Sequence, residues 1–242
     1  MNAWAFDVQL RCGTTIMAMK VAKSLMLADE TIQTVLLAGG YRNCDFIDYQ
    51  NERTRFMFNL AAGGGAIILQ KNCNENSVLE ADILTDGSFS EDVVVPVGGT
   101  KNPLTPELLA QGKYRLDVLD PEGMKVRLEE KSLNNFIKVI RSSLAKSGYS
   151  EQDIAYLAML HMKKSAHDYV LKTLGLSPEQ STYLDHYGHI GQIDQILSLQ
   201  LALEQNKIQQ GDIVTLVSAG IGYAWGAITI KWGKDECNEI NR

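Results

Sequence analysis

One cysteine lies where the chain passes from an apolar segment into a helical pattern. Cys12 follows the apolar residues of 5–10 and precedes Gly13 and an amphipathic run over 14–28. A thiol at the start of a helix meets the helix dipole and unpaired backbone N–H groups, which both favour the thiolate. Cys12 is therefore a candidate nucleophile; the alternative is a small apolar residue packed at the junction.

Two of the four histidines lie where they could serve such a thiol. His161 follows the apolar run 154–160, and the ends of strands in α/β proteins border the usual crevice. His189 stands in a glycine-flanked loop before a predicted helix. Cysteine with a nearby histidine is the usual activated thiol nucleophile. His167 and His186 are interpreted as structural or surface residues.

A glycine-rich turn is the fourth candidate element. Gly220-Ile221-Gly222 lies between the last two predicted strands. Such a turn can direct backbone N–H groups at an oxygen that becomes negative during acyl transfer. A plain hairpin loop is the alternative.

Composition excludes several classes of protein. The 242 residues carry a net charge of -6, with 45% hydrophobic and 21% charged residues, which argues against global disorder and against a nucleic-acid-binding face. No apolar run reaches the roughly 18 residues of a membrane span, and the first residues do not read as a secretory signal. Irregular cysteine spacing predicts neither a disulfide framework nor a zinc site. We expect a reduced, cytoplasmic protein; the cysteines are Cys12, Cys44, Cys73 and Cys237.

Strands and helices alternate along the chain, which predicts an α/β protein with covered sheets. Segment 88–125 contains four of the five prolines and is predicted to be a long loop or crossover. The strand at 78–84 is predicted to neighbour the one at 66–69. Helices are predicted at 14–28, 132–146, 165–174 and 192–204, and strands at 5–10, 34–38, 66–69, 78–84, 154–160, 213–217 and 224–231.

Taken in order, these segments resemble the thiolase-like condensing enzymes, most closely the 3-oxoacyl-[acyl-carrier-protein] synthase III (beta-ketoacyl-ACP synthase III) branch. The likeness runs over nearly the whole chain, through 5–13, the glycines of 63–66, Leu160-His161, Gly188-His189 and 220–226. It implies a thiolase-like α-β-α-β-α layered fold. Residues 1–87 would be the remainder of the N-terminal half and carry the nucleophile, 88–125 an irregular crossover, and 126–242 the C-terminal half.

The resemblance also implies a reaction. Cys12 would be acylated from acyl-CoA, and the acyl group would condense with a malonyl thioester, with loss of carbon dioxide, in fatty-acid or polyketide-like biosynthesis. His161 and His189 would hydrogen-bond the carbonyl of the second thioester, and the N–H groups of Cys12 and Ile221 would form the oxyanion hole. No cofactor or metal is implied beyond the coenzyme A thioester substrate. Lys131 matches a position that docks the acyl-carrier protein.

Several positions depart from the family pattern. His189 stands where the branch has asparagine, Lys164 replaces a polar partner of His161, and 61–63 lacks the family's acid. These departures keep two alternatives open: acyl transfer to an alcohol, amine or carrier without decarboxylation, and a non-catalytic carrier-binding subunit or fragment. The family has roughly a third more chain upstream, so we expect an incomplete N-terminal half. We also expect a homodimer or association with a missing N-terminal fragment.

Overall fold

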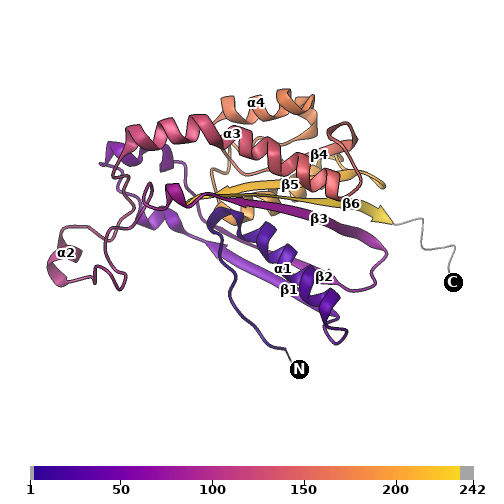
Figure 1. The fold of residues 1–242 in the computed structure, drawn as a ribbon, viewed down its shortest axis with the longest axis horizontal. Coiled ribbons are helices and arrows are strands. Elements are labelled where there is room, and N and C mark those ends of the chain that lie inside the picture. The colour runs from indigo at the N-terminus through magenta and orange to yellow at the C-terminus, as the bar shows by residue number, and fades with distance from the viewer. Residues whose placement is uncertain (1–2, 235–242) are drawn as a thin grey trace.

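A computed structural model describes residues 3–234, in which the chain forms two separate sheets (Figure 1). The larger sheet has four strands; β4 and β5 run parallel, and the other neighbours are antiparallel. Its strands, in spatial order, are β3 (Glu75–Thr85), β6 (Ala224–Lys234), β5 (Ile213–Gly220) and β4 (Ile154–Met159). The smaller sheet is an antiparallel pair, β1 (Thr34–Tyr41) with β2 (Gly63–Gln70).

Helices and sheets stack in alternating layers, which confirms the predicted α/β class (Figure 1). Helices α3 (Pro121–Lys146) and α4 (Lys164–Leu174) cover the outer face of the four-stranded sheet. Helices α1 (Thr14–Ala28) and α5 (Asp194–Glu204) lie between the two sheets. The short α2 (Pro106–Ala110) stands in the long irregular segment. Within residues 3–234 the order is therefore α-β-α-β, one layer fewer than the predicted five.

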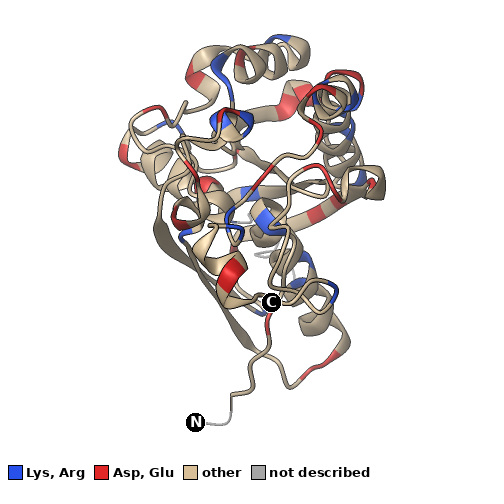
Figure 2. Cartoon of the chain, turned by 90° about the vertical axis from the view of Figure 1, so that its left-hand side faces the viewer, with Lys and Arg blue, Asp and Glu red and all other residues tan. Residues whose placement is uncertain are grey.

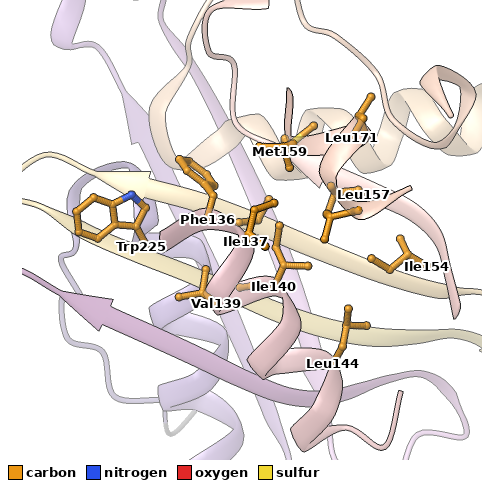
Figure 3. Close-up of a cluster of buried hydrophobic side chains, with 14 of the residues drawn as sticks. Phe136, Ile137, Val139, Ile140, Leu144, Ile154, Leu157, Met159, Leu171 and Trp225 are labelled. Atoms are coloured by element: carbon orange, nitrogen blue, oxygen red, sulfur yellow. The ribbon is translucent and has the colours of Figure 1, made fainter. Parts of the chain in front are cut away.

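The main core lies between α3, α4 and the four-stranded sheet. Side chains of α3 at i, i+4 and i+8, namely Phe136, Ile140 and Leu144, point at the sheet strands that carry Leu157 and Trp225 (Figure 3). All five are buried, and burial of side chains of this size stabilises the fold by about 1.5–3 kcal/mol each. This packing holds β4 and β6, and β5 lies between them. The ends of β4 and β5 border the site described below.

Helix α3 begins 11 residues before the predicted start at 132. Asp120 caps it by accepting from the Gly123 N–H at 3.0 Å, and Pro121 occupies its first position. The extra turns carry few apolar residues, so hydrophobic periodicity does not detect them. The aspartate-proline pair at 120–121 was the sequence signal for this earlier helix start.

Two predictions about strands are wrong. Residues 5–10 form no strand, because no neighbouring strand lies beside them in the part of the chain that the structure describes, and Trp4 and Phe6 are exposed. The strand β3 pairs with β6 and not with β2. A strand that follows its predecessor after a short turn resembles a hairpin in sequence, but here the chain passes to the other sheet.

The predicted boundary at residue 87 stays a prediction. By its pairing, β3 belongs to the four-stranded sheet.

Lys and Arg segments are scattered among Asp and Glu segments and form no single basic face in the view of Figure 2. Among the described helices none is both long and apolar enough to cross a bilayer. Cys237 lies outside the described residues.

Candidate active site

Cys12 lies in a tight turn that leads into α1. The turn Arg11–Gly13 is one short 3-10 helix, and Arg11 has φ 51°, the left-handed region that non-glycine residues seldom adopt. The Thr14 hydroxyl accepts from Leu10 N at 2.8 Å and donates to Arg11 O at 2.6 Å, which locks the turn. Cys12 is only 4% exposed. The predicted position of this thiol at the start of a helix is confirmed.

The predicted glycine turn is brought against the backbone of Cys12. Near the end of β5, the Ser218 hydroxyl donates a hydrogen bond to Cys12 O at 2.7 Å. A Cβ on Gly220 would lie 2.3 Å from Leu10 O and 3.3 Å from Cys12 N, so only glycine fits there. This approach places the turn that contains Ile221 beside Cys12.

His189 is the residue that contacts the Cys12 thiol. Its Nε2 lies 3.1 Å from the Cys12 Sγ. The loop is held by a short parallel bridge: His189 N donates to Asn59 O, and Ala61 N donates to His189 O, both at 2.9 Å. Gly188 has φ +70°, and a Cβ on it would lie 2.6 Å from Asn59 O. The structure therefore brings His189 and Cys12 together.

Asp194 is the member of the cluster that sequence reasoning missed. It is fully buried at the first position of α5, and its Oδ2 lies 2.5 Å from His189 Nδ1. It also accepts from His161 N and Ile190 N, each at 2.7 Å. An acid five residues after a histidine, at the start of a helix, was the available signal. Cys12, His189 and Asp194 thus form a continuous chain of side-chain contacts.

The charge of His189 follows from these contacts. Burial lowers the pKa of His189, but the hydrogen bonds to Asp194 and Cys12 outweigh burial and raise it to about 10. Asp194 accepts the Nδ1 proton, so Nε2 is the nitrogen that faces the thiol. The raised pKa favours the imidazolium form of His189 beside the Cys12 sulfur.

His161 has a different environment. Its ring lies 5.1 Å from the Tyr183 ring, centroid to centroid, and its buried Nδ1 has no hydrogen-bond partner among residues 3–234. Burial lowers its pKa, and this exceeds the opposing effect of Asp194. His161 is thus a neutral imidazole with a free ring nitrogen at the end of β4.

The other predicted residues lie outside this cluster. Lys131 forms an ion pair with Asp86 at 2.7 Å and lies over the Phe89 ring. Lys164 pairs with Asp168 on its own helix. No group of three or more metal-ligating side chains occurs within the described part of the chain.

Comparison with known proteins identifies the family. A family model for 3-oxoacyl-[acyl-carrier-protein (ACP)] synthase III matches residues 6–87, and the model for the C-terminal part of these enzymes matches residues 144–232. Together the two matches span well over half of the chain. The chain belongs to the 3-oxoacyl-[acyl-carrier-protein] synthase III family. It is therefore an acyltransferase of the condensing type that acts in fatty-acid biosynthesis, as the sequence resemblance predicted.

Similarity to individual proteins supports the same family assignment. The beta-ketoacyl-[acyl-carrier-protein] synthase III of Syntrophomonas wolfei is 29% identical over 241 residues, which cover 97% of this chain and 69% of that protein. The enzyme of Chlorobium phaeobacteroides is 28% identical, over a match that covers 96% of this chain and 69% of that protein. The crystal structure of the Thermus thermophilus enzyme gives a TM-score of 0.79 at 25% identity, over 96% of this chain and 69% of that one.

These comparisons confirm the thiolase-like fold. The synthase from Pseudomonas aeruginosa, at 20% identity, has a TM-score of 0.80 and supports the fold alone. The chain spans about two thirds of the length of its curated relatives. The expected incompleteness of the N-terminal half stays a prediction.

Proposed function

We propose that Cys12 is the nucleophile that takes an acyl group from acyl-CoA, and that His189 and Asp194 activate it. The 3.1 Å contact between Cys12 Sγ and His189 Nε2 carries this proposal. His189 accepts the thiol proton, and the thiolate attacks the carbonyl carbon of the donor thioester. The donor C–S bond breaks, and the leaving coenzyme A thiolate takes a proton from the His189 imidazolium.

The second half of the reaction uses the same centre. A malonyl thioester loses carbon dioxide, and the resulting enolate attacks the acyl carbon on Cys12. The bond between that carbon and the sulfur breaks, which restores the thiolate. We propose that His161 and His189 hydrogen-bond the malonyl carbonyl and stabilise the enolate. The unpartnered Nδ1 of His161 and the raised pKa of His189 support these roles.

The oxyanion hole is proposed to consist of the N–H groups of Cys12 and Ile221. The close approach of Gly220 to Cys12 N supports this assignment, because it brings the glycine turn to the atom that would face the developing charge. The roles need only backbone groups, so the side chain of Ile221 is no obstacle.

A second candidate function is acyl transfer to an alcohol or amine without decarboxylation. The observation that favours it is the His189–Asp194 pair, because a histidine oriented by a carboxylate is the arrangement that removes a proton from an attacking hydroxyl. Release of carbon dioxide from a malonyl donor, together with a β-keto product, would exclude this function. An ester or amide product without carbon dioxide would establish it.

We propose that acyl-CoA and an acyl-carrier protein are the substrate carriers and that Lys131 contacts the carrier. The Lys131 side chain is 42% exposed beside Asp86, so its ammonium group can face an acidic partner. Lys131→Gln should raise KM for a carrier-linked donor and leave acylation from acyl-CoA unchanged. Lys138→Gln, on the same helix, is the matched control.

We further propose that an added polypeptide strand, from a second copy or a separate N-terminal fragment, pairs with β1. A cavity of about 380 Å³ separates residues 6–9 from β1, and the strand edge that faces away from β2 has no partner within residues 3–234. Leu36 and Ile68 are exposed on the same sheet. Free edges with apolar surface recruit strands. A monomer that binds no co-expressed fragment, measured by light scattering, would contradict this.

The direct test of the nucleophile is the intact mass after incubation with a panel of acyl-CoA donors. We expect one acyl adduct per chain, which is absent from Cys12→Ala. The matched control is Cys73→Ala, because Cys73 is exposed and distant in sequence from the site. An adduct that persists in Cys12→Ala or disappears in Cys73→Ala would overturn the assignment.

A further inference from the structure

Tyr41 lies in the site although neither the sequence pattern nor the proposed reaction assigns it a role. It is the last residue of β1, is 8% exposed, and packs in one cluster with Cys12, Ile190 and Ile193. Its ring centroid is 6.0 Å from that of His189. The end of the small sheet therefore places a phenol beside the nucleophile.

The loop of His189 is shaped around this ring. Gly191 has φ +60°, and a Cβ there would lie 2.2 Å from the Tyr41 ring atoms. The Gln192 side chain donates to Gly40 O at 2.9 Å, and the Thr15 hydroxyl donates to Gln192 O at 2.6 Å. These bonds join β1, the loop and α1, so the ring has little freedom to move away from the site.

The two side chains nearest in effect to the Tyr41 hydroxyl are Cys12, which raises the pKa of Tyr41, and Asn43, which lowers it. Burial and the neighbouring Cys12 raise the pKa of Tyr41 well above its usual value. The phenol consequently keeps its proton, so toward sulfur it is a hydrogen-bond donor and not a base. Hydrogen bonds to a charged acceptor are stronger than those to a neutral one, so this donor stabilises a thiolate more than a thioester.

We propose that Tyr41 is a further catalytic residue, whose hydroxyl donates a hydrogen bond to the Cys12 sulfur and stabilises it as a thiolate. The inference rests on the proposed function, because it needs Cys12 as the nucleophile. The thiolate exists twice in the cycle: before it attacks the donor carbonyl, and when the acyl carbon–sulfur bond breaks during transfer. Tyr41 keeps its proton throughout, and His189 carries the transferred one.

The test compares Tyr41→Phe with the unmodified protein in two reactions of Cys12. Alkylation by iodoacetamide reports the thiolate without any acyl donor, and acyl adduct formation from acyl-CoA reports the first half-reaction. We expect Tyr41→Phe to slow both by about tenfold at pH 7, the size expected for one hydrogen bond to a charged group. The profile of alkylation rate against pH should move to higher pH. Tyr149→Phe, which removes a hydroxyl outside the site, should change neither rate.

The outcomes separate the two hypotheses. A Tyr41→Phe protein that reacts as fast as the unmodified protein, with the same pH profile, would overturn the role of Tyr41 and leave Cys12 as the nucleophile. An unmodified protein whose Cys12 reacts no faster than a small free thiol, and forms no adduct, would contradict the proposed function and with it the role of Tyr41. Slower alkylation in Tyr41→Phe with an unchanged thermal melting curve would support the proposal.

Discussion

The loop that carries His189 and the end of β4 that carries His161 meet at one carboxylate, but the two rings have different environments. Asp194 accepts from the side chain of His189 and only from the backbone of His161. The first ring is paired on both nitrogens, whereas the second packs on Tyr183 with Nδ1 unpartnered among the described residues.

This difference divides the chemistry between the two histidines. Contacts raise the pKa of His189 and burial lowers that of His161, so one ring is suited to carry a proton and the other to stay neutral. Pairs of titratable groups whose environments move their pKa values apart have distinct acid and base roles. We therefore expect the first half-reaction at the thiol to depend on His189 alone, and His161 to act only on the second substrate.

The largest expected effect follows removal of the imidazole at His189. His189→Gln should lower the overall turnover by about 10³-fold or more, because Cys12 loses the group that takes its proton. The measurement is steady-state product formation, with the exposed His186→Gln in the same loop as control. Turnover within threefold of the unmodified protein would show that His189 is not the base.

A smaller loss is expected from Asp194→Asn. The amide cannot accept the Nδ1 proton as a carboxylate does, so turnover should fall by about 10²-fold while the fold persists. Because the bond to Asp194 raises the pKa of His189, that pKa should fall from about 10 by at least about one pH unit. Titration of the imidazole signals by NMR checks this, and an unchanged pKa would refute the coupling.

The third effect is confined to the second half-reaction. His161→Phe keeps the ring that packs on Tyr183 and removes both nitrogens. Release of carbon dioxide from a malonyl donor should fall by about 10²-fold, the scale of one hydrogen-bond donor to a developing negative oxygen. Carbon dioxide release equal to that of the unmodified protein would remove His161 from the condensation step.

The smallest effect concerns His167, a histidine outside the reaction. Burial and Lys164 lower its pKa to about 4. A base with a lowered pKa leaves the folded state short of a proton that the unfolded chain binds, so stability falls as pH drops from about 6.5 toward 4. His167→Phe should reduce the loss of unfolding free energy between pH 7 and pH 5 by about 1–2 kcal/mol. Urea unfolding at both pH values checks this; an equal loss in both proteins would contradict it.

Cys12 and His189 could be selected as candidate site residues from the sequence, because each lies at a junction between predicted elements. Asp194 and Tyr41 could not be selected in this way. Their roles depend on how closely α5 and β1 approach Cys12, and no local sequence pattern encodes that distance. Segment 5–10 shows the same limit in the fold. It has the apolar residues of a strand, but a strand also needs a neighbour, and hydrophobicity does not show whether one is present.

The most direct test of this division is the rate of acyl adduct formation, followed by rapid quenching and intact mass, in His189→Gln and His161→Phe side by side. If His189 alone serves the thiol, His189→Gln forms the Cys12 adduct at least about 10²-fold more slowly, and His161→Phe stays within about threefold of the unmodified protein. Equal slowing of the adduct in both variants would contradict the account, because the two histidines would then act together on the first step.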